Sequence, residues 1–417
     1  MSYWKQAFSD WNHLFCEELR TLFKDKGVLI FFFLVPLAYP LLYSFIYTNE
    51  VVREVPIVVV DDNRSSLSRK FLRDLDASPD VEIVSYCANM QEAQLHIKHR
   101  EAYGIVYVPR DFTRRLSRGE QVAVSAYADM SGMLYYKSVL SAATDVSLKM
   151  NANIKIQRGG GTTEEEDKLS EHAINYEVVS LYNPQNGFAA FLIPGVLILI
   201  IQQTMLLGVG MAAGTIREKN LFHHLLSIKR HPRGMLRIVW IKSFAYLLVY
   251  IPVSVYVLGV VPHIFRLNQI GDPWTLALFI LPFLIACTFF AMTVSGLVRH
   301  RESSIVLIVF SSVPLLFISG ISWPGSALPA FWKAFSFVFP STFGINGFVA
   351  INNMGAHLSD VRMEWCFLWL QTLIYMMTAC VVYHHSISKS HQCHAEKLKA
   401  DMALLKQAQT EDQELQS

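Results

Sequence analysis

Side chains suited to catalysis or metal binding are few in this sequence, and the densest group lies near its C-terminal end. His384, His385, His391, Cys393 and His394 supply imidazole nitrogens and a thiol, the ligand types that zinc prefers. Their spacing fits no established zinc motif, so a histidine-rich segment without a site is the competing interpretation, and we assign no metal. The sequence also has no G-x-x-x-x-G-K followed by Ser or Thr, no H-E-x-x-H and no G-x-S-x-G. It therefore predicts no enzyme of these classes and no nucleotide site of the usual kind.

Gln202 and Gln203 form the most polar pair inside a long uncharged stretch. Two interpretations are open, a hydrogen bond to a neighbouring helix or contact with a substrate headgroup along a transport path. No Asp, Glu, Lys or Arg falls near the middle of a predicted span, where such residues mark the ion and proton pathways of coupled carriers. Energy for transport would then have to come from another chain.

A candidate docking surface for such a chain lies in the basic connection 212–242. It begins Arg217-Glu218-Lys219, and Glu218 is its single acidic residue. Apolar residues follow at spacings that would place them on one side of a short helix: Leu221, Phe222, Leu225 and Leu226. An ordinary positively charged loop would explain the bases but not this apolar side. We predict that a cytoplasmic ATPase binds here, with Arg217, Glu218, Lys219, Leu221, Leu225 and Leu226 as the coupling residues.

The sequence contains six long stretches without Asp, Glu, Lys or Arg, and each is a candidate membrane span. They cover residues 27–49, 178–216, 243–265, 273–298, 303–332 and 365–388. A membrane-spanning helix needs about 20 apolar residues, and a content of 52% hydrophobic residues agrees with several spans. The predicted fold class is an α-helical polytopic membrane protein with six transmembrane helices and an inserted extracytoplasmic α/β domain. The predicted divisions are 1–26, the first span 27–49, the domain 50–177, a five-helix part 178–388 and a tail 389–417.

Basic residues indicate the orientation of these spans. They concentrate in 212–242, in 299–302, before the first span and in the tail, and positively charged connections face the cytoplasm. This places both termini in the cytoplasm and residues 50–177 outside it. The first apolar run is too long for a signal-peptide core, so we interpret it as a retained anchor. We predict the inner membrane of a bacterium with an outer membrane, and a periplasmic domain. The formal net charge of +2 says little about partners, and we predict no nucleic-acid binding.

Two aromatic segments are expected at the membrane surfaces. Trp4, Phe8, Trp11 and Phe15 recur every three or four residues, which predicts an amphipathic helix in the interface of the lipid bilayer before the first span. A helix packed on a soluble partner is the alternative. Between the last two spans, residues 319–350 are mostly apolar and are interrupted by prolines. They predict short helices that dip into the outer interface as a cap, with Trp323, Pro324, Pro329 and Pro340 as its marker residues.

In the predicted outer domain, β-branched runs alternate with helical patterns. Strands are expected over 55–60, 81–86, 103–108 and 122–127, and helices over 65–76, 89–100, 111–118 and 133–157. Alternation at this spacing predicts crossover connections and an α/β sheet. Ser65 or Ser66 would cap the first helix. Cys87 is the only cysteine in the domain, so we expect a buried thiol and no disulfide framework.

Taken in order, these motifs resemble the permease subunits of type-2 ABC exporters that carry a large extracytoplasmic domain after the first span. The resemblance covers essentially the whole chain. It lies in Arg217-Glu218-Lys219 with Leu225-Leu226, in Trp323-Pro324 with Leu328-Pro329 and Pro340-Ser-Thr, and in Val59-Val60-Asp61-Asp62-Asn63 of the outer domain.

The resemblance implies a half-transporter that pairs with itself or a homologous permease and binds separate ABC ATPase subunits. The chain would then hold no cofactor, and ATP and Mg²⁺ would bind to the partner ATPase. In this family the segment before the first span and the region around Glu218 act as coupling elements. Lys219-Asn220-Leu221-Phe222 stands where the commoner pattern has a Gly-Thr pair, so the contacts at that point differ.

The predicted function is the membrane subunit of an ATP-driven exporter for an amphipathic, lipid-like or drug-like substrate. The outer domain would receive a periplasmic adaptor protein or shape an exit for the cargo. The alternative is a membrane-anchored scaffold or secretion-associated protein that recognises partners through its outer domain without pumping. Dependence on an ATPase discriminates between the two.

Overall fold

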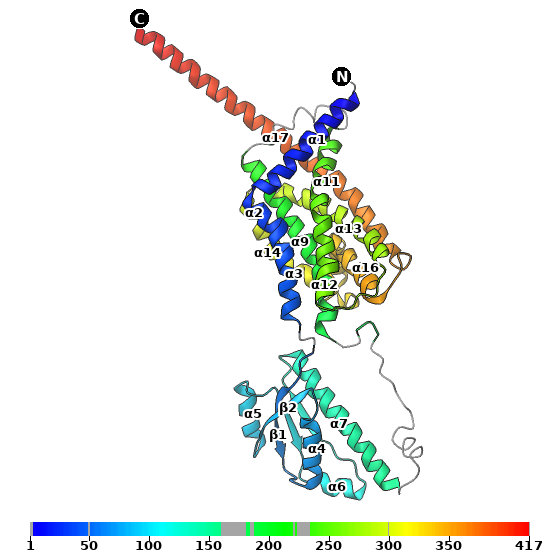
Figure 1. The fold of residues 1–417 in the computed structure, drawn as a ribbon. Helices are drawn as coiled ribbons and strands as arrows, with labels where there is room; N and C mark the ends of the chain where they lie inside the picture. Colours follow the sequence, from blue (N-terminus) through cyan, green and yellow to red (C-terminus); the bar gives the residue numbers. More distant parts are fainter. Residues whose placement is uncertain are drawn as a thin grey trace. The chain divides into compact units, whose positions relative to one another are not determined.

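The computed structural model describes residues 3–48, 51–159, 181–183, 187–219, 222, 234–298 and 300–416. Its contacts divide the chain into two compact units (Figure 1). One consists of Met1–Thr48 with Leu181–Ser417, and the other of Asn49–Ser180. The first is helical, and the second carries the sheet. The second unit therefore interrupts the first in sequence, as the charge pattern predicts.

Within its described residues, the helical unit contains six helices that are long and apolar enough to cross a membrane. They are Lys26–Ile46, Phe188–Glu218, Gly234–Ile264, Pro273–Leu297, Arg301–Ile318 and Arg362–Gln392. These agree with the six uncharged runs, so the predicted fold class is confirmed. Before the first of them lies α1 (Tyr3–Lys24), which is amphipathic and packs against α11 (Gly234–Val255) (Figure 1).

In the described part of the chain, two of the spans contain a π-helical segment. The first span joins α2 (Lys26–Leu29), η1 (Ile30–Leu34) and α3 (Val35–Ile46), and the third joins α11, η3 (Tyr256–Val260) and α12 (Val261–Ile264). An extra residue in a helical turn rotates the side chains that follow it. In η1 the ring of Phe32 is fully buried and lies against the ring of Tyr250, with 5.1 Å between centroids. A Cβ on Gly208 would overlap the Phe32 ring, so this glycine permits the close contact.

The remaining spans are α9 (Phe188–Glu218), α13 (Pro273–Val294) with the short η4 (Ser295–Leu297), α14 (Arg301–Ile318) and α17 (Arg362–Gln416). Between α14 and α17 lie η5 (Gly325–Ala327), α15 (Ala330–Ser336) and α16 (Pro340–Met354), and α15 and α16 meet at 88°. Such a pair is either a broken span or a re-entrant segment. The rings of Phe283 and Phe279 in α13 lie where Gly344 and Gly347 of α16 lack side chains, so α16 packs into the bundle.

The described part of the second unit, residues 51–159, contains a four-stranded sheet in the order β2-β1-β3-β4. The strands are β1 (Val55–Asp61), β2 (Val81–Tyr86), β3 (Gly104–Val108) and β4 (Ser125–Ala128). β1 runs parallel to β2 and β3, and β4 is antiparallel to β3. The helices are α4 (Ser66–Asp76), α5 (Met90–Lys98), α6 (Phe112–Arg118) and α7 (Met133–Gly159). The predicted strands and helices of this domain are thus present, with ends shifted by a few residues.

Both faces of the strand β1 are buried, and alternate side chains of β1 point to opposite sides of the sheet. Ile57 and Val59 pack with Phe71 of α4 and with residues of α6 and α7, while Val58 and Val60 pack with Ala93 of α5. Helices therefore cover both faces of the sheet at β1. Because β1 is buried on both sides, its sequence is a nearly continuous run of β-branched residues.

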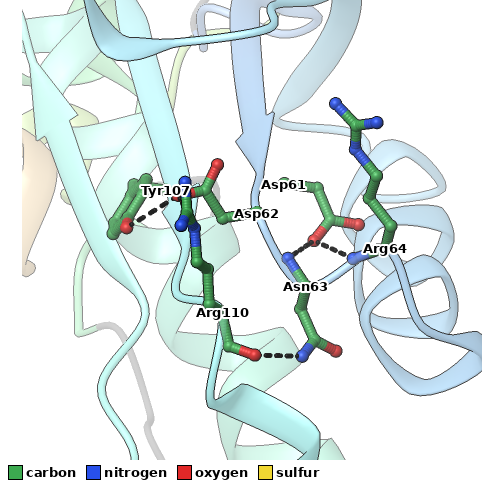
Figure 2. Close-up of polar contacts among 6 residues, drawn as sticks. All are labelled: Asp61, Asp62, Asn63, Arg64, Tyr107 and Arg110. Atoms are coloured by element: carbon green, nitrogen blue, oxygen red, sulfur yellow. Dashed lines mark hydrogen bonds and ion pairs between the residues drawn. The ribbon is translucent and has the colours of Figure 1, made fainter.

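The turn after β1 is held by its own side chains (Figure 2). Asp61 Oδ1 accepts the N–H groups of Asn63 and Arg64, each at 3.0 Å, and Asn63 donates to the Arg110 carbonyl at 2.7 Å. Asp62 accepts from the hydroxyl of Tyr107 at 3.3 Å, and burial together with the Asp62 charge raises the pKa of Tyr107. Ser65 follows as the N-cap of α4, in a reciprocal box with Ser68, as one of the two predicted alternatives.

Candidate functional site: a polar junction and an apolar cavity

Asp25 joins three segments of the helical unit at the turn between α1 and α2. Its Oδ1 accepts the Gly27 N–H at 3.0 Å and the Arg301 guanidinium at 2.7 Å, and its Oδ2 accepts the Thr215 hydroxyl at 3.2 Å. Desolvation alone would raise the pKa of Asp25, but the Val28 N–H, the Arg301 charge, the Gly27 N–H and the Thr215 hydroxyl together lower it below 3.8. The first span is thereby tied to the end of α9 and the start of α14.

Arg217 and Glu218, adjacent at the end of α9, bind opposite sides of the short connection between α13 and α14. Arg217 donates to the carbonyl of Ser295 at 3.0 Å and to that of Val298, which are acceptors at the end of α13 and η4. Glu218 accepts the backbone N–H of Arg301 at 2.8 Å, at the start of α14. The Val298 carbonyl follows the end of η4 and the Arg301 N–H begins α14, positions where helix ends leave backbone groups without partners in their own helices. The Ser295 carbonyl also accepts the Val298 N–H at 3.2 Å. Each group meets a side chain of the favourable charge. Arg217 also donates to the Ser386 hydroxyl of α17 at 3.0 Å.

We call the set Asp25, Thr215, Arg217, Glu218 and Arg301 the polar junction. Its backbone geometry depends on Gly214, because a Cβ there would lie 2.9 Å from the Cα of Arg301. Backbone atoms cannot swing away as a side chain can. Gly214 thus lets the end of α9 approach the start of α14 closely enough for Glu218 of α9 to accept the Arg301 N–H of α14.

Beside the polar junction, Glu18 of α1 and Lys242 of α11 form a buried ion pair. Their side chains are only 7% and 6% exposed, and the hydroxyl of Tyr246 donates to the second oxygen of Glu18. Both charges have lost nearly all contact with water, so each depends on the other for compensation. The pair fixes α1 to α11, and removal of either charge would leave the other buried without a partner. An open cavity of about 670 Å³ is lined both by this pair and by Asp25, Glu218 and Arg301 of the polar junction.

The aromatic side of α1 packs on the same helix. The rings of Trp11 and Phe15 stack at 5.0 Å between centroids, and both lie within 6 Å of the Phe244 ring of α11, at 5.8 and 5.7 Å. Trp4 and Phe8 lie in α1, but their side chains are outside the described part of the chain. The predicted amphipathic helix is present, and its position in a membrane interface stays a prediction.

The two glutamines on α9 have different surroundings. Gln202 Oε1 accepts the N–H of Ser341 at 2.6 Å in the first turn of α16, so this side chain bonds helix to helix. Gln203 is 7% exposed, and neither its oxygen nor its nitrogen has a hydrogen-bond partner among the described residues. It lines a cavity of about 320 Å³ between α3, α9 and α14, whose other lining residues are mostly apolar: Val35, Tyr39, Leu199, Leu207, Val313 and Leu316.

The marker residues of the predicted cap lie at the ends of the short helices. Pro324 precedes η5, Pro329 caps α15, and Pro340 is the first residue of α16. Trp323 is half exposed, and α15 adds exposed rings of Phe331, Trp332 and Phe335. The short helices are present, and an outer interfacial location stays a prediction.

Of the predicted coupling residues, Arg217, Glu218 and Lys219 lie at the end of α9, and Leu221, Leu225 and Leu226 lie outside the described residues. Sequence reasoning missed Asp25, Arg301, Glu18 and Lys242. Glu18 and Lys242 looked like ordinary charges beside a span, and nothing local marks them as partners 224 residues apart. Asp25 does carry a local indication, because an Asp before Lys26-Gly27 at a helix start is a capping pattern.

These features define a polytopic helical membrane protein whose spans converge on a polar junction and line a mostly apolar cavity. A family model described as ABC-2 family transporter protein matches residues 26–381, and the chain belongs to that family. The comparisons with curated proteins and with solved structures return no match. The chain is thus an ABC-2 permease membrane subunit, and such subunits lack ATPase activity and generally partner an ABC ATPase.

Proposed function

We propose that this permease exports an amphipathic, lipid-like or drug-like substrate along a path lined by α3, α9 and α14. The observation that carries the proposal is Gln203, whose buried amide has no hydrogen-bond partner among the described residues and lines a mostly apolar cavity. An unpaired buried amide costs about 1–3 kcal/mol of stability, so a side chain serving only the fold would be better replaced by Leu. A substrate with a polar headgroup and an apolar body would match this lining.

Coupling to the ATPase would pass through the polar junction and the Glu18–Lys242 pair. In this proposal the ATPase contacts the connection after Glu218, and both termini and this connection lie in the cytoplasm. Arg217 and Glu218 would transmit the movement, because each contacts a different side of the connection between α13 and α14. The ATPase would supply ATP and Mg²⁺. Residues 50–177 would then be periplasmic and receive an adaptor protein, and a second permease copy or homologue would complete the transporter in the inner membrane.

The substrate path is tested with Gln203→Leu in the complete complex, reconstituted in lipid nanodiscs. The readout is ATP hydrolysis stimulated by two probes, rhodamine 6G and a fluorescent phosphatidylethanolamine. Loss of one neutral hydrogen bond, about 0.5–1.5 kcal/mol, should raise the half-stimulating concentration of a bound probe about 2- to 12-fold while thermal stability stays the same or rises. Gln371→Leu is the matched control, since Gln371 is also buried in a span and does not line this cavity. Equal stimulation of both variants and the parent by a probe that stimulates the parent would refute a role for Gln203 in binding.

The coupling proposal is tested by affinity purification of the tagged chain from native membranes beside Glu218→Ala. An ATPase with a phosphate-binding loop should co-purify with the parent. In the variant, either less ATPase should co-purify, or the bound ATPase should no longer drive transport. Glu302→Ala serves as control, because Glu302 is a neighbouring acid in the first turn of α14. If no ATPase co-purifies under conditions that preserve lipid, the exporter proposal fails and the scaffold becomes the better interpretation.

A further inference from the structure

Three side chains of metal-ligand type meet in the α/β unit where β2 passes into α5. They are Cys87, Glu92 and His96, and one ligand atom from each lies within 4.8 Å of the other two. Cys87 is buried, Glu92 is exposed and His96 is half-buried, so the group lies at the boundary between the core and the surface. All three residues belong to the α/β unit and none lines the cavity of the proposed transport path.

The local fold fixes all three positions. Cys87 directly follows β2, and its N–H donates to the Val59 carbonyl at 2.8 Å. Asn89 caps α5 by accepting the Glu92 N–H at 2.9 Å, and Glu92 Oε2 in turn accepts the Ala88 N–H at 2.7 Å. His96 lies four residues after Glu92, one turn further along the same side of α5. The end of β2 and the first turns of α5 therefore position all three side chains, and only a short connection separates the two elements.

A sulfur, a nitrogen and a carboxylate oxygen form a ligand set typical of zinc. Zinc binds such atoms at about 2.0–2.3 Å in tetrahedral geometry, which places the ligand atoms roughly 3.5 Å apart. Closing the present group to that spacing needs movements of about 1 Å, and the exposed Glu92 and half-buried His96 have room for them. The bond to Ala88 uses Oε2 of Glu92, which leaves Oε1 for a metal.

His96 also has the outer partner that metal-binding histidines usually have. Its Nδ1 lies 2.6 Å from Oε2 of Glu101. A carboxylate at one ring nitrogen fixes the tautomer, orients the ring and makes the other nitrogen, Nε2, a stronger ligand. The pair occurs at the end of α5, where Glu101 follows a turn at Arg100 with positive φ of 59°.

Charge near the group has both signs. Arg64, Arg69 and Arg73 line the cavity beside Cys87 and oppose a cation. Negative charge comes from the proposed ligands themselves, as the Cys87 thiolate that a metal would bind and the Glu92 carboxylate, and from Glu101 in contact with His96. From this geometry we infer that the α/β unit binds one Zn²⁺ through Cys87, Glu92 and His96, with the fourth position open to water. The ion would join the end of β2 to α5.

The test uses the full chain in detergent, stripped of metal and titrated with Co²⁺, which reports thiolate ligation by an ultraviolet charge-transfer band. The parent should develop this band with one equivalent, and Zn²⁺ should remove it by competition. Cys87→Ser, His96→Gln and Glu92→Gln should each lose the band or bind Co²⁺ far more weakly. Glu101→Gln should keep the ligands but weaken binding about 10- to 100-fold, as outer partners of metal-binding histidines do.

His99→Gln is the matched control, because His99 caps the same helix and does not belong to the group. It should bind Co²⁺ as the parent does. Size-exclusion profiles and thermal midpoints without metal identify any variant that is misfolded, and the exposed Glu92→Gln keeps the test decisive if Cys87→Ser is unstable. A band of the same strength and affinity in the parent, His96→Gln and Cys87→Ser would assign it to the other cysteines of the chain and overturn the inference. Absence of any band in the well-folded parent would overturn it as well.

Discussion

Breaking the buried pair between Glu18 and Lys242 should destabilise the protein more than removing the pair altogether. Both side chains are almost fully buried, and Tyr246 shares the carboxylate of Glu18. Lys242→Met leaves a buried carboxylate without its cation, and such a loss costs about 3–5 kcal/mol. Glu18→Leu leaves an unpaired ammonium and also removes the acceptor of the Tyr246 hydroxyl, which adds up to about 1–3 kcal/mol.

The combined variants should recover most of this loss. Glu18→Leu with Lys242→Met leaves no buried charge but removes the acceptor of the Tyr246 hydroxyl, which keeps Tyr383 beside it. Up to about 1–3 kcal/mol should therefore remain. Adding Tyr246→Phe removes that hydroxyl and should bring stability close to the parent, since apolar replacement of a buried pair is often neutral or stabilising. The expected order of loss is Glu18→Leu, then Lys242→Met, then the double variant, then the triple variant.

Thermal unfolding in detergent, followed by tryptophan fluorescence, measures this order. At an unfolding entropy of about 2.1 cal/mol/K per residue, a unit of roughly 285 residues should lose about 5–8 °C for Lys242→Met and about 2–5 °C for the double variant. Trp11→Phe is a suitable control for disturbance of the same helix contact. The reasoning is refuted if each single variant shifts the midpoint by less than about 2 °C, or if the double variant loses the sum of the two singles.

Further predictions concern the polar junction. Gly214→Ala should destabilise the protein because its Cβ would lie 2.9 Å from a backbone Cα, whereas Gly259→Ala, with nothing within 4 Å, should be neutral or slightly stabilising; thermal midpoints compare them. Asp25 has a lowered pKa in the folded state, so its contribution is present above the unfolded value and is lost as the pH falls through the folded pKa. The difference in midpoint between the parent and Asp25→Asn should thus stay constant from about pH 7 to 5 and shrink below about pH 4, and a difference independent of pH would count against the ion pair. Glu218→Gln should keep the hydrogen bond to the start of α14 and cost little, whereas Glu218→Ala should lose about 0.5–2 kcal/mol, measured by the same unfolding assay.

The sequence predicts the elements of this protein well because each has a local cause. Six apolar runs without charges can satisfy their backbone groups in a membrane only as helices. The alternation along β1 and the Ser65 cap are likewise properties of a few neighbouring residues. The 88° bend between α15 and α16 follows a proline at each helix start, which the sequence shows. Element ends and types therefore follow from short stretches of chain.

The candidate site was harder to predict because its contacts join distant parts of the chain. Arg217 and Glu218 are recognisable as a motif, but their partners at Ser295, Val298 and Arg301 are about 80 residues away. The glutamine pair shows the same limit. Composition cannot tell which of Gln202 and Gln203 faces another helix, since that depends on the rotation of α9 against α16 and α14.

The placement of Arg217 and Glu218 changes how the docking motif is understood. Both side chains form hydrogen bonds within the chain. An ATPase that bound mainly to them would have to break these bonds. The residues that follow them, from 220 onward, are the better candidates for direct contact. In our proposal the ATPase moves that segment, and the two side chains transmit the movement to the ends of α13 and α14. Because Arg301 also holds Asp25, the start of the first span would move with them, and the cavity around Gln203, which lies between α3, α9 and α14, would change shape.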